Sequence, residues 1–348
     1  MMEEVKSAVR FPAEWEPHEA TWLAWPHYEN DWPGKFAAIP WVYAEIIRHL
    51  SKHEAVELIV NDAQSERRVK TILDKANALN DRVRFHRWPT NRVWTRDSGC
   101  SFVLTADRLA GVTWRFNAWA KYPNWKQDVK IGRLMAEAAG ADQVEPTFRD
   151  TRVVLEGGSI DSNGRGTLLT TEECLLSKIQ QRNPRMKRGD YEQVFAEYLG
   201  ITRVIWLASG IAGDDTHGHV DDITRFVSSK AIVTMIESNQ KDANYKPLRE
   251  NLGRLQRASN NAGKKFEIIE LPMPGPVFFD GRRLPASYAN FYIANGIVLV
   301  PVFNDRNDRT ALDTLARLFP DREAVGIYSG DLIWGFGALH CMTQQQPA

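Results

Sequence analysis

The sequence has few cysteines, no long apolar run and no signal-like beginning. Cys100, Cys174 and Cys341 are odd in number and widely spaced, which excludes a disulfide framework and predicts a reducing, cytoplasmic location. The longest uncharged apolar run, Ile297 to Phe303, has seven residues, whereas a membrane-spanning helix needs about 18. The first residues, MMEEVKSAVRF, are partly acidic and lack the apolar centre of a signal peptide. The sequence therefore predicts neither a secreted protein nor a membrane protein.

The chain also lacks an excess of charge of either sign. Its 44 Lys and Arg residues balance its 44 Asp and Glu residues, so the formal net charge is zero. This balance argues against nucleic acid or an anionic membrane as a partner. Apolar residues make up 43% and charged residues 25%, which are ordinary values for a globular protein. Twelve tryptophans in a neutral chain favour a site for a small molecule.

No Pro/Ser-rich linker or low-complexity stretch divides the 348 residues, so we expect a single domain over residues 1–348. Apolar periodicity predicts an α/β fold in which a hairpin, a helix and a strand recur. Asp62 is expected to cap one of the helices. The predicted strands are 20–25, 55–60, 82–88, 101–105, 110–115, 152–159, 166–171, 203–207, 222–227, 231–236, 266–271, 289–293, 297–303 and 324–328, and the helices 39–52, 63–77, 125–139, 191–199, 245–262 and 308–318.

The densest polar cluster is GDDTHGHVDD, residues 213–222. One interpretation is a metal site, because His217, His219 and Asp221 resemble part of the metallo-β-lactamase motif. A zinc site needs three or four converging ligands, and only His340 follows among the histidines, so a metal is disfavoured. A solvated acidic turn explains Asp215 better than His219 and Asp221. The last two alternate, and on a strand they would share a face.

Three further clusters carry residues that suit chemistry. Cys341 follows a glycine-containing loop and stands beside His340, so it is a candidate nucleophile, whereas the other cysteines are expected to be buried and inert. Glu156 ends an apolar strand before Gly157-Gly158, whose spacing does not fit a phosphate-binding loop. Asp97 lies in NRVWTRDSG, a segment that by itself is most simply a surface turn.

Together these clusters place one cysteine, one histidine and three carboxylates at strand ends of a repeating α/β fold. Carboxylates in a dry pocket bind a planar cation through paired hydrogen bonds. A thiolate is then positioned to attack the carbon of that cation. This combination predicts a guanidinium substrate.

Several long motifs, in this order, also resemble the agmatine deiminase family. They are PAEWEPHEATWLAWP (12–26), WTRDSG (94–99), FNAW (116–119), LEGGSIDSNGRGTLLTTEECLL (155–176), GDDTHGHVDD (213–222), PASYANFYIANGIVLVP (285–301) and HCMTQQ (340–345). The wider guanidine-modifying superfamily includes arginine deiminases and bacterial peptidylarginine deiminase. The resemblance implies the pentein fold, with five ββαβ modules around a pseudo-fivefold axis and the active site in the central funnel.

The resemblance also implies roles for the residues of these motifs. It makes Cys341 the nucleophile, His219 the acid/base, Glu156 its orienting partner, Asp97 and Asp221 the ligands of the guanidinium, Trp94 a pocket wall and Asp215 a weaker candidate for the distal amine. The implied reaction converts agmatine and water into N-carbamoylputrescine and ammonia, a step of polyamine biosynthesis, through a covalent thiouronium on the cysteine. No metal or organic cofactor is implied.

Some positions depart from the family pattern and bear on the choice of substrate. Cys100 stands where proline is usual, Phe336 and Ala338 interrupt a run of glycines, and His217 replaces a small polar or acidic residue. Free arginine, peptidyl-arginine or another guanidino-amine remain alternative substrates. A metal-dependent hydrolase and a non-catalytic guanidine-binding protein are less favoured alternatives. A homo-oligomer stays open.

Overall fold

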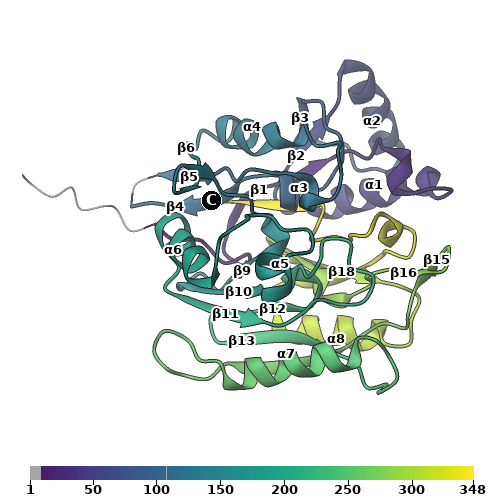
Figure 1. Ribbon diagram of the computed structural model, residues 1–348. Coiled ribbons are helices and arrows are strands. Elements are labelled where there is room, and N and C mark those ends of the chain that lie inside the picture. Colours follow the sequence, from purple (N-terminus) through teal and green to yellow (C-terminus); the bar gives the residue numbers. More distant parts are fainter. Residues whose placement is uncertain (1–8, 107) are drawn as a thin grey trace, which may run out of the picture.

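Five small sheets share one strand order in the computed structural model, which describes residues 9–106 and 108–348 (Figure 1). In four of them, two antiparallel strands are followed by one or two helices and by a strand that runs parallel to the second. Four of these units run β4 Ser101–Leu104, β5 Leu109–Val112, α4 Ile131–Ala138 and β6 Asp142–Val144; β9 Asp161–Ser162, β10 Thr167–Thr171, α5 Glu172–Leu176, α6 Arg188–Leu199 and β11 Arg203–Leu207; β12 Thr224–Phe226, β13 Ala231–Ile236, α7 Tyr245–Arg257 and β14 Glu267–Pro272; and β17 Tyr292–Ala294, β18 Ile297–Val302, α8 Asp308–Leu318 and β19 Glu323–Tyr328.

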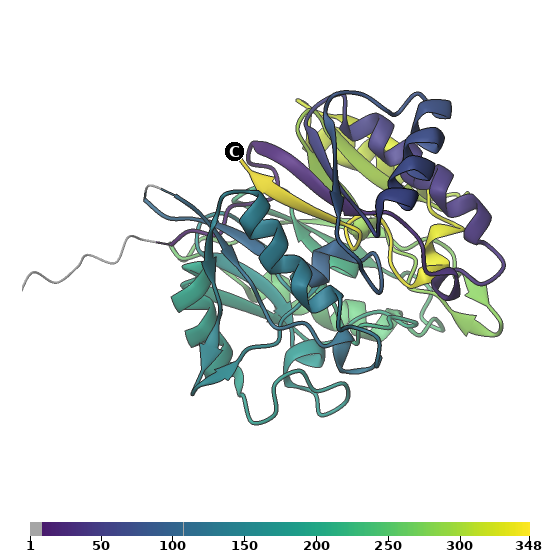
Figure 2. The same cartoon turned by 90° about the horizontal axis from the view of Figure 1, so that it is seen from above.

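The fifth sheet joins the two ends of the chain. Its strand order is β20, β1, β2, β3, and the C-terminal β20 (Thr343–Pro347) lies antiparallel to β1 (His18–Ala24), as Figure 2 shows in yellow and purple. Helix α1 (Ile39–Leu50) precedes β2 (Ala55–Val60), and helix α2 (Ala63–Lys75) precedes β3 (Val83–Arg87). The pairing of β20 with β1 holds residues 340–342 in the interior, beside α3 (Thr95–Ser98).

Local sequence explains most of these elements. Every residue of β2, AVELIV, is buried, as expected for a strand with parallel neighbours on both sides. Asp62 caps α2, since its Oδ1 accepts a hydrogen bond of 2.7 Å from the Ser65 amide. Helix α1 presents one apolar face to the core. In Figure 1, α1, α2, α7 and α8 lie at the periphery of the molecule.

The polar turns that precede the hairpins lie next to one another. They are α3, the 3₁₀ turns η5 (Gly157–Ser159), η6 (Val220–Asp222) and η7 (Tyr288–Asn290), and residues 340–342 before β20. Contacts join α3 to η5, η5 to η6, and η6 to η7, while α3 also contacts β20. The same position in five successive units therefore converges on one place in the fold.

Several predictions are wrong in detail, among them the helix predicted over 125–139, which is α4 preceded by η4 (Asp128–Lys130). The strand predicted over 152–159 ends at Arg152 in β8, because the chain must turn into η5 at Glu156. The helix predicted over 245–262 ends at Arg257, since Asn260 Oδ1 accepts the amides of Ala262 and Lys264 and forms a turn instead. His219 and Asp221 do not alternate on a strand: His219 is the N-cap of η6 and Asp221 lies within it.

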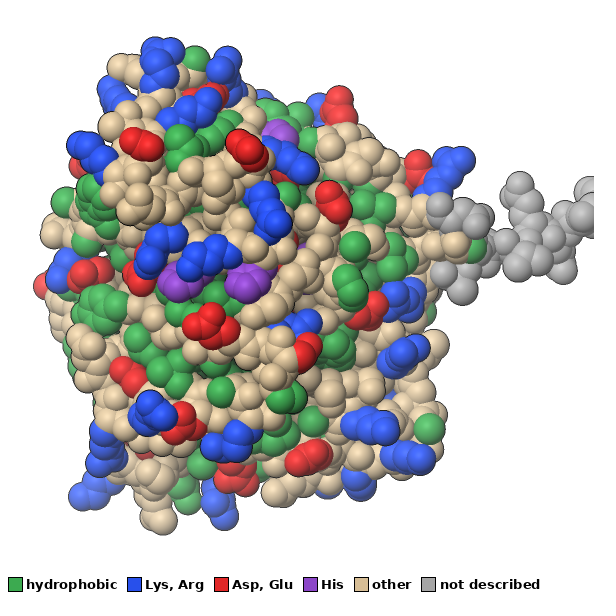
Figure 3. Space-filling view, turned by 180° about the vertical axis from the view of Figure 1, so that it is seen from behind, with side chains coloured by type: hydrophobic (Ala, Val, Ile, Leu, Met, Phe, Trp, Pro, Cys, Tyr) green, Lys and Arg blue, Asp and Glu red, His purple; other side chains and the backbone are tan. Residues whose placement is uncertain are grey.

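The remaining elements are short. Two hairpins, β7 (Thr147–Phe148) with β8 (Thr151–Arg152) and β15 (Phe278–Phe279) with β16 (Arg282–Arg283), extend from the units, and the other 3₁₀ turns are η1 Glu29–Asp31, η2 Phe36–Ala38, η3 Ala118–Ala120, η4 Asp128–Lys130 and η8 Leu332–Gly335. Acidic and basic side chains are interspersed on the face in Figure 3. Among the described helices, none has the length and apolar character needed to span a bilayer. The single domain over 1–348 stays a prediction.

Candidate active site

Cys341 lies at the inner end of a cavity, just before β20. Its side chain is nearly buried, and its Sγ accepts a hydrogen bond of 3.0 Å from Asn290 Nδ2 of η7. Asp221 Oδ2 lies 3.7 Å from the same sulfur. Gly337 allows this approach, because a Cβ atom there would stand 2.6 Å from the Trp94 ring and 3.1 Å from Cys341 Cβ. The segment before β20 therefore packs closely against the side chains of Trp94 and Cys341.

His219 is completely buried among three carboxylates. Its Nδ1 lies 3.9 Å from both Asp97 Oδ2 and Asp221 Oδ1, and its Nε2 lies 3.7 Å from Glu156 Oε2. These distances exceed those of hydrogen bonds, and neither ring nitrogen has a hydrogen-bond partner. The ring is therefore surrounded by negative charge yet free to exchange a proton.

Glu156 is fixed by an arginine that the sequence did not reveal. Arg182 Nε lies 3.1 Å and 3.2 Å from the two Glu156 oxygens, and both side chains are fully buried. The other Arg182 nitrogens donate to the carbonyls of Gln180 and Thr216. Burial by itself would raise the pKa of Glu156, but Arg182 and His219 hold this pKa below its usual value. The carboxylate that faces His219 therefore stays ionised.

Asp97 and Asp221 flank His219 but differ in their own partners. Asp97 accepts hydrogen bonds from Trp119 Nε1 (2.8 Å) and from the Gly158 amide (3.0 Å). Asp221 Oδ2 lies 2.7 Å from His340 Nδ1, whereas its Oδ1 is buried without a hydrogen-bond partner. Each carboxylate is thus held rigidly, and Asp221 keeps one acceptor oxygen for a donor that enters the site.

Gly158 lets these groups converge. A Cβ atom at this position would stand 2.5 Å from His219 Nδ1 and 3.0 Å from carboxylate oxygens of Asp97 and Asp221. No side chain other than hydrogen fits there without displacing the imidazole. The second glycine of LEGG therefore serves close packing of the site, which agrees with the exclusion of a phosphate loop.

The cavity that reaches Cys341 has a volume of about 540 Å³. Of the residues expected in the site, Cys341, Asp97, Trp94 and Asp215 line it, whereas His219, Glu156 and Asp221 are fully buried behind these. Asp215 lies at a wall of the cavity, where it accepts hydrogen bonds from Lys121 Nζ and the Tyr122 hydroxyl. The structure thus links Cys341 to Asp221, Asp221 to His219, and His219 to Asp97 and Glu156, while Trp94 and Asp215 lie at the walls of the cavity.

The protonation of the cysteine and the histidine follows from this crowding. Burial, and then the negative charges of Asp221, Asp222 and Asp97, raise the pKa of the Cys341 thiol well above its usual value. Burial alone would lower the pKa of His219, but Asp97 and other nearby groups raise it well above its usual value. Without a cation in the cavity, these shifts favour a neutral thiol and a protonated imidazole.

The pKa of Asp97 is raised to about 6. Burial is the largest cause, the positive charge of His219 opposes it, and the charges of Asp221 and Glu156 add to it. Among the three carboxylates around His219, Asp97 is consequently the one that is protonated most easily at mildly acidic pH, because the pKa values of Glu156 and Asp221 are lowered.

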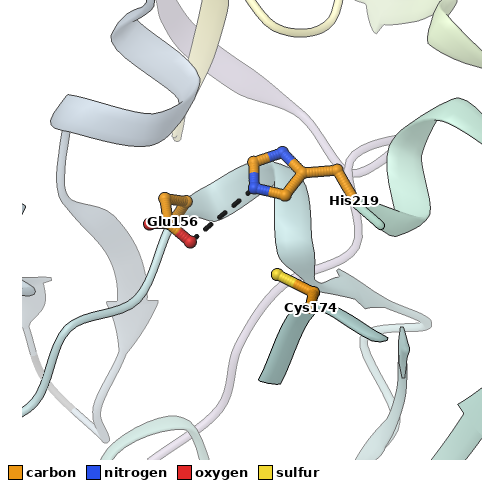
Figure 4. A group of neighbouring side chains, drawn as sticks. All are labelled: Glu156, Cys174 and His219. Carbon is orange, nitrogen blue, oxygen red and sulfur yellow. Dashed lines mark ion pairs between the residues drawn. The ribbon is translucent and has the colours of Figure 1, made fainter. Parts of the chain in front are cut away.

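A second cysteine lies against the acid/base pair. The ligand atoms of Glu156, Cys174 and His219 lie within 4.8 Å of one another, as Figure 4 shows. These residue types could hold a metal ion, but Arg182 already occupies both oxygens of Glu156 with positive charge. His217 does not join the group, since its Nε2 lies 3.1 Å from Ser177 Oγ. Of the metal ligands considered from the sequence, His219 and His340 both lie beside Asp221, whereas His217 lies apart from them.

Sequence reasoning missed several residues of this site. Asn290, Arg182, and Glu14, which lies 2.8 Å from His340 Nε2, are polar residues inside otherwise apolar or loop-like motifs, and only their burial marks them. The surface turn favoured for NRVWTRDSG is wrong: Arg96 is buried, and its guanidinium donates to Gln345 Oε1 at 2.7 Å and to the His340 carbonyl at 3.3 Å. Arg96 thereby ties α3 to the segment that carries Cys341.

Comparison with known proteins shows the family of the chain. The family described as Porphyromonas-type peptidyl-arginine deiminase matches residues 10–347. Agmatine deiminase from Medicago truncatula is 35% identical over 372 residues, covering 97% of this chain and 96% of the plant protein. The chain belongs to the agmatine deiminase family. Like its relatives in the pentein superfamily, it has a mixed α/β fold, as predicted.

Solved structures of agmatine deiminases superpose over nearly the whole chain. The Enterococcus faecalis enzyme has a TM-score of 0.89 at 29% identity and covers 99% of this chain, with 98% of its own length matched. The C. jejuni enzyme has a TM-score of 0.85 at 28% identity, with coverages of 100% and 98%. This member of the agmatine deiminase family is accordingly a hydrolase of guanidino C–N bonds.

Three of the positions at which this chain departs from the family pattern are either buried in the packing or line the cavity. Cys100 and Ala338 are buried, and burial raises the pKa of the Cys100 thiol, which disfavours its thiolate form. Phe336 lines the cavity, has a φ of 65°, and lies 4.7 Å below the Arg282 guanidinium. Phe336 therefore shapes the outer cavity, whereas Cys100 and Ala338 belong to the packing.

Proposed function

We propose that this protein hydrolyses agmatine to N-carbamoylputrescine and ammonia through a covalent intermediate on Cys341. The observation that carries the proposal is the position of Asp221, which lies 3.7 Å from Cys341 Sγ through one oxygen and 3.9 Å from His219 Nδ1 through the other. A planar cation bound by this carboxylate stands next to both a nucleophile and a proton donor. The name of the Medicago relative and the structure of a C. jejuni cysteine-to-serine variant with substrate bound support the choice of reaction.

Binding of the guanidinium prepares the nucleophile. Asp97 and the unpartnered Asp221 Oδ1 accept its N–H groups. The substrate's positive charge offsets the carboxylates that raise the pKa of Cys341. The thiol then loses its proton to solvent more readily, while Asn290 donates its hydrogen bond to the sulfur. Trp94, which lines the cavity, confines the planar group.

The reaction then proceeds through two additions. The Cys341 thiolate attacks the guanidinium carbon, and His219 gives its proton to the departing nitrogen, which leaves as ammonia. An S-alkylthiouronium remains on the sulfur. His219, now neutral, accepts a proton from water as the water oxygen attacks the same carbon. Collapse of that adduct releases the thiolate and the ureido product, and the proton of the adduct's hydroxyl group passes to solvent. Glu156 orients the ring at its Nε2 side.

Asp215 is proposed to meet the distal ammonium of agmatine. Lys121 and Tyr122 now donate to its carboxylate, and Arg282 lies 3.6 Å away. The ammonium of the substrate is expected to take the place of the partly exposed Lys121. Arg92, a cation that could recognise the carboxylate of free arginine, is already paired with Asp31, which favours agmatine over arginine.

The arrangement of the five units supports a finer description of the fold. We infer that they are five ββαβ modules around a pseudo-fivefold axis, within one catalytic domain. Each module supplies site residues from the turn before its first strand: Asp97, Glu156, His219 with Asp221, Asn290 and Cys341. No organic cofactor enters the proposed mechanism, and the proposed partner is a small cationic substrate.

A substrate panel tests the proposal. Agmatine, arginine, an arginyl peptide and shorter or longer guanidinoalkyl amines are assayed for ureido product and ammonia. We expect the highest kcat/KM for agmatine, no turnover in Cys341→Ala, and a higher KM for agmatine in Asp215→Asn. Asp280→Asn is the matched control, because Asp280 is an exposed residue that lines the same cavity. Turnover in Cys341→Ala, or a preference for arginine, would contradict the proposal.

A further inference from the structure

A second cavity, of about 450 Å³, reaches Arg182 from outside the active site. Five of its lining residues are arginines: Arg115, Arg149, Arg152, Arg182 and Arg185. Among the described residues that line it, none is an aspartate or a glutamate. In a chain with a net charge of zero, this is a local concentration of positive charge inside a concave surface.

The positive charge of this cavity is only partly neutralised by its surroundings. Arg182 is paired with Glu156, Arg152 NH1 lies 2.7 Å from Glu145, and Arg149 lies 3.8 Å from Asp190. Within the described part of the chain, Arg115 and Arg185 have no carboxylate partner. The cavity therefore presents two uncompensated guanidinium groups beside a third that is weakly paired.

The arginines converge from separate parts of the chain and are partly fixed in place. Arg115 follows β5, Arg149 lies between β7 and β8, and Arg185 precedes α6. Arg152 donates to the Thr113 carbonyl at 2.7 Å, while its Nε is buried without an acceptor. The Arg152 Nε–H group can therefore donate a hydrogen bond to a bound ligand.

Backbone strain is found at the same rim. Arg149 and Arg185 have φ values of 47° and 79°, in the left-handed region that residues other than glycine seldom adopt. Strained residues of this kind are maintained where the surrounding structure holds them, often at ligand-binding sites. Both residues line the cavity in these conformations.

We infer that this cavity binds a small molecule that carries two or more anionic groups, such as phosphates or carboxylates. The guanidinium fork matches the oxygens of either group through paired hydrogen bonds. The volume lies within the ~300–1,000 Å³ range of small-molecule sites. Because Arg182 lines this cavity and also holds Glu156, the bound anion lies next to the pair that faces the acid/base. The inference goes beyond the proposed deiminase activity and does not depend on it.

Calorimetric titration of the full chain with pyrophosphate, and separately with citrate, tests the inference. We expect saturable binding with one site per chain, weakened at least tenfold in Arg115→Ala and in Arg185→Ala and reduced as salt is raised. Arg309→Ala is the matched control, since this arginine is exposed on α8, away from the cavity. The tighter of the two probes identifies phosphate or carboxylate as the preferred group.

Three results would overturn the inference. The first is that neither pyrophosphate nor citrate binds at low salt. The second is that Arg309→Ala loses as much affinity as the cavity variants, and the third is that Arg115→Ala and Arg185→Ala both keep the wild-type affinity. Gel filtration of the same variants adds a fourth: if pyrophosphate does not bind and the substitutions change the oligomeric state, the arginines form an interface between copies of the chain. Circular dichroism confirms that each variant is folded before titration.

Discussion

Replacement of Arg182 by methionine tests how the acid/base pair is held. The substitution removes the cation from Glu156 but leaves a side chain of similar length in the same fully buried position. Glu156 would then be a buried carboxylate with no positive partner apart from the protonated His219. Breaking a buried ion pair from one side typically costs about 3–5 kcal/mol, because the remaining charge stays desolvated.

The structure indicates that Arg182→Met falls within that range. All three guanidinium nitrogens donate hydrogen bonds, two of them to carbonyls that also lose their donors. We expect Glu156→Gln/Arg182→Met to lose less stability than the sum of the single variants, since it leaves no unpaired charge. Arg182→Lys keeps the charge without the planar fork, so its loss should be intermediate.

The assay is urea unfolding followed by tryptophan fluorescence, together with the pH dependence of kcat. In the wild type the pKa of Glu156 is lowered, so its pairing stabilises the fold at neutral pH and this contribution is lost as the pH falls through the folded-state pKa. Without Arg182, burial raises that pKa, and the acidic limb of kcat should move to higher pH. A stability loss below about 1 kcal/mol with an unshifted limb would refute the reasoning.

Three further outcomes are expected in the site. Asp97→Asn and Asp221→Asn should each lower kcat/KM for agmatine by at least about thirtyfold, the equivalent of one charged hydrogen bond of about 2 kcal/mol; near-normal values would remove that residue from substrate binding. The wild-type kcat/KM should fall as the pH drops below about 6, because Asp97 takes up a proton there and no longer attracts the cation; an identical fall in Asp97→Asn would assign the limb to another group. Iodoacetamide should inactivate through Cys341 before it labels buried Cys100, and agmatine should protect; preferential labelling of Cys100 would be the opposite result.

The repeating pattern of the chain could be predicted from the sequence because each unit has a strong local signal. The strands Ala55–Val60, Arg203–Leu207 and Ala231–Ile236 and the helix Asp308–Leu318 have the predicted bounds, since each is a continuous apolar run or an amphipathic segment between polar residues. The strand β20 was not predicted, because its sequence TQQQP is polar. Its burial depends on pairing with β1, more than 300 residues away in the sequence.

The chemistry of the site could be predicted further than its geometry. Residue types and motifs selected Cys341, His219 and Glu156, and the structure places these side chains around one end of a cavity. Their orientation could not be predicted, because η5 and η6 are turns fixed by contacts between units rather than by local periodicity. Arg182 escaped notice for the same reason: its partner Glu156 is 26 residues away and both lie in irregular segments.

Mass spectrometry of the acid-quenched enzyme during turnover tests the central claim most directly. With agmatine, or with a slower guanidine substrate, a covalent adduct equal to the substrate less ammonia should appear on the peptide that contains Cys341, and it should be absent from Cys341→Ala. An adduct on Cys100 or Cys174, or turnover in which no substrate carbon ever becomes attached to Cys341, would contradict the account.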